Sequence, residues 1–400
     1  MKITFRTFES GAGDCIFLVL NDDVSSSYHI MVDCNVLTTE IKKYIREVLE
    51  KRIDTLLITH IDSDHANGIT KLFRDPEFAD MKIGQILFNG FQPQGEILKQ
   101  LPGKTKAKLE AAADLLPPTV DSYNQKTNGM DAASLIAELN KHPQWRVVWR
   151  KETILAGESI PLGNKGEWGN LRFLSPTPKA LENLLHEVKL EYAGRLSEAP
   201  PIEEFEDQEK YYELMLRLSE LRKKPKAARK TSAPAITKEL LERYAQTDAN
   251  ESNVTCANKA SLAFYWEGGE AQKRILIMGD AVSSQVVKEL NIIEENDIWF
   301  EAIKVSHHGS KHNTSLGLTA KVDSSHYFFT GGKEGEGPHI ETVAKIALKP
   351  LADDKDHREL HYNHERGIGL WAEMKKEEPL QLLDSYHIHL NTNTIHEFES

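Results

Sequence analysis

The sequence is poor in cysteine and in long apolar runs, and it has fewer positive than negative side chains. Its three cysteines, Cys15, Cys34 and Cys256, include no CxxC pair and provide no disulfide framework. No apolar stretch approaches the roughly 20 residues that a membrane helix needs. The N-terminal segment MKITFRTFES alternates like a strand and lacks the apolar region of a signal peptide. We therefore expect a reduced, cytoplasmic protein with no membrane span.

The formal net charge of -12 argues against a surface that is basic throughout. It does not exclude nucleic acid as a partner, because attraction depends on local patches and on bound metal ions. The composition, with 40% hydrophobic and 28% charged residues, is that of a globular protein. Most of the sixteen histidines lie in the last quarter of the chain, which is notable for a residue that often binds metal or carries protons.

Two groups of strand-like segments flank a charged helical stretch. Segment 222–230 in that stretch reads RKKPKAARK, which is typical of a basic linker. A terminal hairpin is expected from 387–390 and 394–398. The other strands are predicted near 3–8, 16–20, 28–33, 54–59, 146–149, 171–174, 261–266, 274–278, 302–305 and 327–330, with helices at 39–50 and 340–348.

Two histidines and two aspartates occur within the run 60–65, HIDSDH, directly after the buried strand 54–59. Imidazole nitrogens and carboxylate oxygens are the ligands of borderline and hard divalent ions. In an extended turn, positions 60 and 62 point one way while 64 and 65 turn toward a second point, so one loop can supply two adjacent ions. The alternative is a solvated loop that starts a helix, with Asp64 as its N-cap. Four ligands at this spacing favour the metal site.

Two later strands end in similar chemistry. The strand RILIM at 274–278 is followed by Gly279 and Asp280, and the segment 303–310, IKVSHHGS, ends its strand in His307 and His308. Adjacent histidines at the end of a strand point to opposite sides. We therefore expect one of the pair to bind metal and the other to orient it or to contact substrate.

The order of these motifs resembles the metallo-β-lactamase superfamily, and within it is most similar to the soluble hydrolase domain of the competence DNA-uptake protein ComEC. Further shared features are the turn GDC at 13–15, an apolar strand that ends in Asp33, and the segment NKAS at 258–261. A glycine-rich turn that ends in His339 completes the order. The resemblance covers about 1–90 and 251–349.

The resemblance implies an α/β (α+β) fold, a four-layer αββα sandwich with a metal site along one edge of its two sheets. Residues 1–178 would form the N-terminal half of this domain, with a helical excursion at 91–143. Residues 251–400 would form its C-terminal half. Residues 179–250 would be a charged helical insertion with a basic linker.

The resemblance also implies roles for single residues. His60 and Asp62 would bind one ion, Asp64 and His65 a second, and Asp280 would bridge the two. The predicted metal ligands are His60, Asp62, Asp64, His65, Asp280 and His307, with His308 as the alternative to His307. The predicted catalytic residues are Asp64, Asp280, His308 and His339, and the residues predicted to support the ligands are Asp33, Asp14, Asn258 and Ser261.

The run HIDSDH departs from the commoner HxHxDH, since Asp62 stands where a histidine is usual. A carboxylate hardens that site, so Mn²⁺ competes with Zn²⁺, and one or two ions per chain are expected. An isolated histidine usually follows the first motif. His142 and His186 are the only histidines in that interval, and both lie in predicted insertions.

Two histidine features are open to more than one interpretation. His339 either reaches the edge that holds His307 or has no role at the start of a helix. His357, His361 and His364 resemble a second ligand set, but their polar, irregular segment favours a solvated loop.

A site of this kind predicts a hydrolase that uses metal-bound hydroxide, most naturally a phosphodiesterase or nuclease. A lactone, thioester or other acyl substrate is an alternative. Another is an interaction component of a defence or DNA-processing system that binds a protein partner through 179–250. The basic linker either contacts a DNA or RNA backbone or is simply solvated. Its six cations are Arg222, Lys223, Lys224, Lys226, Arg229 and Lys230.

Overall fold

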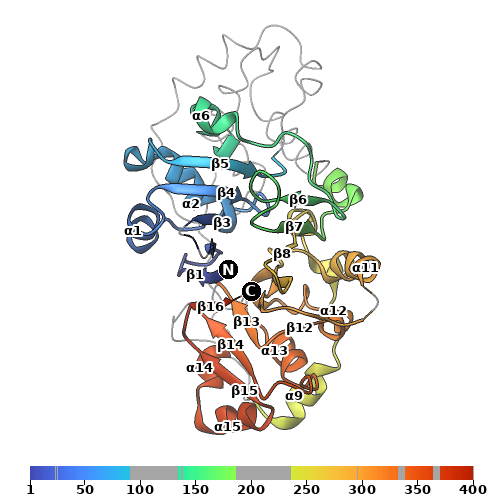
Figure 1. Cartoon of the computed structure of the whole chain (residues 1–400). Helices are drawn as coiled ribbons and strands as arrows, with labels where there is room; N and C mark the ends of the chain where they lie inside the picture. The colour runs from blue at the N-terminus through green and yellow to red at the C-terminus, as the bar shows by residue number, and fades with distance from the viewer. Residues whose placement is uncertain are drawn as a thin grey trace, which may run out of the picture.

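The structure is a computed structural model that describes residues 1–90, 134–185, 236–331, 338–363 and 370–399, apart from positions 23, 25, 137 and 295. In this part of the chain, two mixed sheets form the centre of the molecule, with helices outside them (Figure 1). Each sheet combines antiparallel strands on one side with parallel strands on the other.

The first sheet has the strand order β16-β1-β2-β3-β4-β5. Its β3, β4 and β5 are parallel, while β16, β1, β2 and β3 pair in antiparallel fashion. The bounds are β1 Lys2–Thr7, β2 Ile16–Asn21, β3 Ser27–Val32, β4 Arg52–Leu57, β5 Lys82–Leu87 and β16 Ile395–Glu399.

The second sheet has the order β15-β14-β13-β11-β9-β8-β7-β6. Its strands from β9 to β15 are parallel, and β8, β7 and β6 are added in antiparallel fashion. A separate parallel pair joins β10 (Ile298–Trp299) to β12 (Val322–Asp323). The bounds are β6 Ser159–Pro161, β7 Asn170–Phe173, β8 Phe264–Gly268, β9 Lys273–Ile277, β11 Ala302–Lys304, β13 His326–Phe329, β14 Arg358–Tyr362 and β15 Ile388–Asn391.

The apolar run of β2 shows why the sheets are layered. Ile16 and Leu18 face a core between the two sheets, whereas Phe17 and Val19 face a core on the outer side. A strand buried on both faces is apolar throughout, which explains the lack of alternation. The helices α1 (Thr39–Glu47) and α2 (Ser63–Arg74) cover the outer core of the first sheet.

A third core covers the outer side of the second sheet and is closed by helices from the C-terminal part of the chain. The described chain is thus an αββα sandwich of four layers, and the predicted fold class is confirmed. Other helices are α6 Pro143–Arg146, α9 Lys238–Ala245, α10 Cys256–Lys259, α11 Ser283–Ile293, α12 Leu316–Lys321, α13 Ile340–Ala347, α14 Leu370–Met374 and α15 Glu377–Ser385.

The predicted terminal hairpin is wrong. Strand β15 extends the second sheet beside β14, whereas β16 pairs with β1 in the first sheet. The strand predicted at 146–149 is also replaced, because helix α6 occupies 143–146 and only Trp149 makes a bridge, to Ile86. Both errors arise because pairing partners distant in the sequence decide where a short apolar segment lies.

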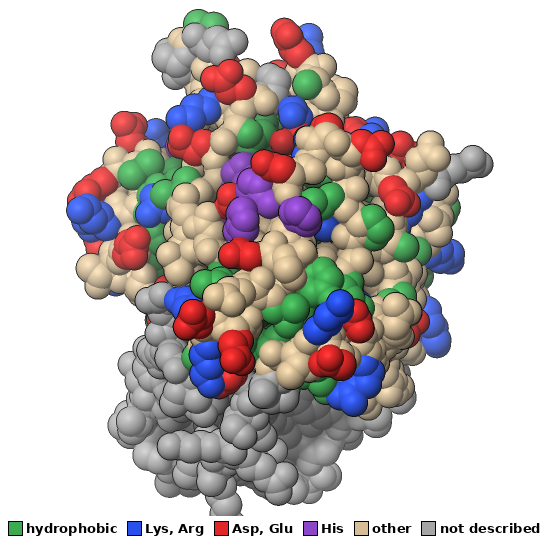
Figure 2. Space-filling model, turned by 90° about the horizontal axis from the view of Figure 1, so that it is seen from below, with side chains coloured by type: hydrophobic (Ala, Val, Ile, Leu, Met, Phe, Trp, Pro, Cys, Tyr) green, Lys and Arg blue, Asp and Glu red, His purple; other side chains and the backbone are tan. Residues whose placement is uncertain are grey.

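Within the described ranges, no helix combines the length and apolar character that crossing a membrane requires. On the face shown in Figure 2, histidine side chains form one group beside acidic side chains. The described histidines in the sandwich occur mainly at two places, the carboxyl ends of the parallel strands and the beginning of β13 with its neighbours.

A buried ion pair ties β14 to the segment before β13. Arg358 is 1% exposed, and its Nε and Nη2 donate to the two carboxylate oxygens of Asp323 at 2.9 and 2.7 Å. We expect Arg358→Leu to lower the free energy of unfolding by about 3–5 kcal/mol, because it leaves a buried carboxylate without its bidentate partner. Removing the exposed lysine of the Lys376–Glu373 pair should cost less than about 1 kcal/mol.

Denaturant unfolding of both variants checks this, and equal effects would contradict it.

The contribution of the Arg358–Asp323 ion pair to stability also depends on pH. Burial disfavours the Asp323 carboxylate, but Arg358 outweighs it and holds the Asp323 pKa below its ordinary 3.8. The stabilisation that the ion pair gives is therefore complete above the pKa of Asp323 in the unfolded state. It is lost as the pH falls through the lower pKa of Asp323 in the folded state.

Candidate metal centre

The motif residues meet at one edge of the sandwich, where parallel strands of both sheets end. Asp33 follows β3 and His60 follows the end of β4 in the first sheet, while Asp280 and His307 follow β9 and β11 in the second. Carboxyl ends of parallel strands lie at the same sheet edge, and loops there commonly carry function. Residues 220 positions apart in sequence, His60 and Asp280, are thereby brought together.

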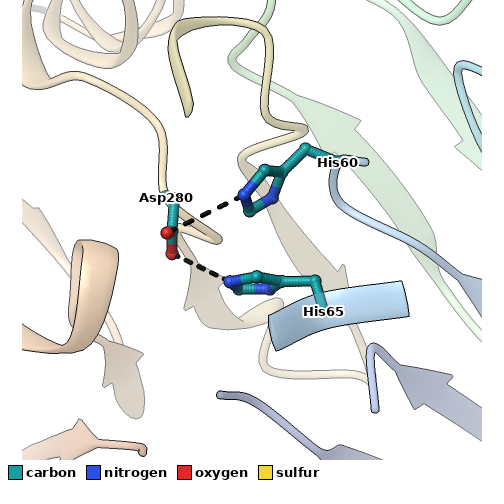
Figure 3. Close-up of side chains that lie close together, drawn as sticks. All are labelled: His60, His65 and Asp280. Atoms are coloured by element: carbon teal, nitrogen blue, oxygen red, sulfur yellow. Dashed lines mark ion pairs between the residues drawn. The ribbon is translucent and has the colours of Figure 1, made fainter. Parts of the chain in front are cut away.

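His60, His65 and Asp280 form the first candidate ligand group. His60 Nε2 lies 3.8 Å from Asp280 Oδ2, and His65 Nε2 lies 3.3 Å from Asp280 Oδ1. Figure 3 shows the carboxylate facing both imidazoles, with His65 projecting from the start of α2. One ligand atom from each of the three lies within 4.8 Å of the others, close enough to share an ion.

Asp64, His65 and His308 form a second group of the same kind. His308 Nε2 lies 3.8 Å from Asp64 Oδ2, and the ring of His308 is stacked at 5.7 Å from that of His65. His65 belongs to both groups, so the two candidate positions are adjacent.

Each imidazole is oriented through its other ring nitrogen. His65 Nδ1 lies 2.7 Å from Asp33 Oδ2, and His308 Nδ1 lies 2.7 Å from the carbonyl oxygen of Thr330. His60 Nδ1 lies 3.0 Å from Thr59 Oγ1. Metal-binding histidines are typically held in this way, with one nitrogen donating to an oxygen and the other turned toward the ion.

The atoms turned inward have unmet bonding capacity. Within the two groups, five buried ligand atoms find no hydrogen-bond partner among the described residues. Isolated buried polar atoms are costly, so a cluster of them requires an explanation such as a bound ion. Their nitrogen and oxygen chemistry fits a divalent cation. The five are His60 Nε2, His65 Nε2, His308 Nε2, Asp64 Oδ1 and Asp280 Oδ1.

The electrostatics of the cluster is also that of a cation site. Burial lowers the pKa of His60 to about 3, which keeps its imidazole neutral and able to bind metal. Burial opposes charge on His308 as well, but the carboxylates of Asp14 and Asp64, 3.4 and 3.8 Å from its ring nitrogens, outweigh it and raise its pKa to about 9. Without an ion, protons on histidine thus balance the buried carboxylates. Metal binding would displace those protons.

The two adjacent histidines, His307 and His308, lie in different surroundings. His308 is buried within the second group, whereas the His307 side chain is 25% exposed, with Nε2 3.6 Å from Asp280 Oδ2. Both residues adopt left-handed backbone conformations, with φ of 47° and 54°. Such strain is common at functional sites and here turns one ring inward and leaves the other at the rim.

The residues predicted to support the ligands lie beside them. Asn258 Nδ2 is 3.4 Å from Asp280 Oδ2 and 3.3 Å from His307 Nδ1. Ser261 Oγ accepts a hydrogen bond from the Asp280 backbone amide at 3.1 Å. Asp14 forms a buried ion pair with Lys304 and lies 3.4 Å from His308 Nδ1. The placement agrees with the predicted roles, which remain predictions.

Asp62 and His339 belong to neither of the two candidate ligand groups. Asp62 is the N-cap residue of α2, and its Oδ2 lies 3.8 Å from His60 Nε2. The alternative to a metal site was a solvated loop that starts a helix with Asp64 as its N-cap. Helix α2 does begin here, but Asp64 lies inside it rather than at its N-cap. His339 is the N-cap of α13, 6.4 Å from the ring of His312, and lies outside the two candidate groups.

Other predicted residues do not join the centre. His142 packs against Phe73 and Trp145 on the outer side of the first sheet. His186 and the six cations of 222–230 lie outside the described residues.

Sequence reasoning missed Lys304, which is fully buried in β11. Its Nζ pairs with Asp14 and donates to the carbonyl of Gly279 at 2.9 Å. The signal that identifies it is a lysine within the otherwise apolar strand AIKV. Because a buried lysine is almost always paired, that position predicts a nearby carboxylate.

Gly13 lies against the backbone of the first motif. A Cβ at this position would come within 1.7 Å of the Asp64 carbonyl oxygen and 2.8 Å of Asn35 Cβ. We expect Gly13→Ala to displace Asp64, to weaken metal binding and to cost at least about 1–3 kcal/mol of stability. Gly317→Ala is the matched control, since its nearest described contact would be Ser315 Oγ at 3.8 Å. Denaturant unfolding and metal titration check both, and equal behaviour of the two variants would refute the prediction.

No protein-family model matches the chain, and no curated protein matches it. Among solved structures, it is similar to a crystal structure of a new diphosphatase from the PhnP family, with a TM-score of 0.36 and 8% sequence identity. The alignment covers 100% of this chain and 98% of that one. A likeness at this level says nothing about what this chain acts on, and the similarity to the competence-protein domain stays a prediction.

Proposed function

We propose that this protein is a metal-dependent hydrolase whose centre holds one or two divalent ions, Zn²⁺ or Mn²⁺. The observation that carries the proposal is the convergence of five buried ligand atoms that lack hydrogen-bond partners among the described residues. His60 and Asp280, with Asp62 beside them, would hold one ion. Asp64, His65 and His308 would hold the other, with His65 and Asp280 between the two positions.

A divalent ion held there would supply a Lewis acid and would lower the pKa of a coordinated water toward 7. The chain's own residues would do the rest. Asp33 and Thr330 keep His65 and His308 in the orientation that directs Nε2 inward. With His308 assigned to an ion, donation of a proton to the leaving group falls to His307 or His339. His307 lies at the rim, where its ring can reach a bound substrate.

A phosphodiester, including a nucleic-acid backbone, is the substrate class that we favour. Divalent cations at the centre would attract the phosphoryl oxygens of such a substrate and would offset the negative charge that develops on them during cleavage. The basic segment 222–230 would add backbone contacts, although it lies outside the described residues.

A substrate panel tests this proposal. Protein loaded with Zn²⁺ or Mn²⁺ is assayed on bis-p-nitrophenyl phosphate, single- and double-stranded DNA and RNA, beside a lactone, a thioester and a p-nitrophenyl ester. We expect cleavage of phosphodiesters. Turnover of the acyl substrates alone would replace the phosphodiesterase with an acyl hydrolase. Inertness toward both sets would contradict the hydrolase itself and favour an interaction component that acts through 179–250.

A further inference from the structure

A second group of histidines lies away from the candidate metal centre. His326 begins β13, Glu359 and His361 lie on β14, and His396 lies on β16 of the other sheet. The end of β13 leads to Thr330, which holds His308 of the centre. At about 3.3 Å per residue, the four positions from His326 to Thr330 separate the two places by about 13 Å along the strand.

These side chains face the layer between the two sheets. In β13, His326 is two positions from Phe328, which belongs to that core, and Phe328 is paired with His361 in register. In β16, His396 is paired with Phe5, another residue of the same core. Paired residues of adjacent strands share a face of the sheet. Imidazoles therefore occupy positions where the fold otherwise places apolar side chains.

The spacing of three ligand atoms matches a tetrahedral ion. His326 Nδ1 lies 3.0 Å from His361 Nε2, which lies 3.3 Å from Glu359 Oε2. The remaining distance, from His326 Nδ1 to Glu359 Oε2, is 3.8 Å. An ion bound at about 2.0–2.1 Å by tetrahedral ligands requires ligand atoms about 3.3 Å apart. The three atoms are thus at ligand spacing with little rearrangement.

The surroundings hold these ligands in place. His361 is 2% exposed, its Nδ1 donates to the carbonyl of Asn393 at 2.9 Å, and its ring stacks on Phe328 at 4.2 Å. This leaves the lone pair of His361 Nε2 directed at the other two ligands. Asn391 donates to Glu359 Oε2 at 2.6 Å. Such outer contacts orient the ligands of metal sites.

The protonation states also suit metal binding. Burial lowers the pKa of His326 to about 4 and also lowers that of His361, so both rings are neutral at physiological pH. The ring of His396 lies 3.8 Å from that of His326, and burial lowers its pKa to about 3. A neutral imidazole from β16 is therefore beside the group and is placed to act as a fourth ligand.

We propose that His326, Glu359 and His361 form a separate, structural site for Zn²⁺ or a similar borderline divalent ion, with His396 as its link to the other sheet. The ion would join β13 and β14 to β16, which otherwise contacts the first sheet through β1. Its role would be to fasten the C-terminal strand across the sandwich. The proposal does not depend on the chemistry of the candidate metal centre.

Zinc content and thermal stability test the proposal. Wild type and the double variant His326→Gln/Glu359→Gln are equilibrated with Zn²⁺, and the bound metal per chain is measured. We expect the double variant to bind one zinc fewer per chain and to lose the part of the zinc-induced rise in Tm that this site supplies. Its hydrolytic activity should be unchanged. Equal zinc content and equal rise in Tm would overturn the proposal.

His357→Gln is the matched control, since His357 lies beside Glu359 but its Nδ1 pairs with Asp356. It should retain the full zinc content. Should the double variant fail to fold, Glu359→Gln alone preserves side-chain shape and should weaken zinc binding at this site by about 100-fold or more. A component of the tetrahedral Co²⁺ absorption of wild type that is lost in Glu359→Gln would support the site. The same spectrum in both proteins would refute it.

Discussion

Asp280→Asn is expected to abolish hydrolysis, lowering kcat/KM by about 10³-fold or more, equivalent to about 4 kcal/mol of transition-state stabilisation. The carboxylate lies between His60 and His65 and is 1% exposed. Asparagine keeps its shape and its backbone contacts with Ser261 and Asn313. The substitution therefore removes the charge that would bridge two ions while leaving the local fold intact.

The control for this prediction is Asp384→Asn, a carboxylate exposed on α15, which should leave activity unchanged. Steady-state kinetics on the best phosphodiester of the panel measures both variants, with unfolding curves to verify their folding. An Asp280→Asn protein that is folded, binds the normal amount of metal and retains more than a tenth of the activity would refute the bridging role.

His65→Gln is expected to have the largest effect on metal content, because His65 is shared by both candidate ligand groups. Binding at both positions should weaken by about 100-fold or more, since even outer contacts of metal ligands are worth 10–100-fold. His308→Gln should weaken only the position that includes Asp64. Metal content after equilibrium dialysis therefore distinguishes the two variants.

His142→Gln serves as the control for these two variants, because His142 packs on Trp145 at the outer side of the first sheet. It should bind metal like the wild type. Equal loss in the His65 and His308 variants would show that the two groups bind as one unit. No loss in either would remove both from the ligand set.

The sequence could predict which residues of the candidate metal centre lie close together, because these residues follow strand ends. HIDSDH, Asp280 and the histidine pair each come directly after an apolar strand. The resemblance predicted that the three motifs meet at one edge of the two sheets. What it left open was the choice between His307 and His308. That choice depends on two successive left-handed backbone conformations, which tertiary contacts impose and which local propensity disfavours in histidine.

Of the second histidine group, the sequence indicated only His361, as part of a possible second ligand set. The segment around His361 is polar and predicted a solvated loop, yet it forms β14 in the interior of the second sheet. His326 and His361 become neighbours only because β13 and β14 pair in parallel, and His396 joins them only because β16 leaves the expected hairpin for β1. Each of these contacts is decided by long-range strand pairing.

The metal content of the purified protein tests the central claim most directly. The His326→Gln/Glu359→Gln background removes the proposed structural site from the count, so that elemental analysis reports the candidate metal centre alone. After equilibration with Zn²⁺ or Mn²⁺, we expect one or two ions per chain, and a loss of that metal on addition of His65→Gln. A folded protein that binds no ion, or binds equally with and without His65, would contradict the account.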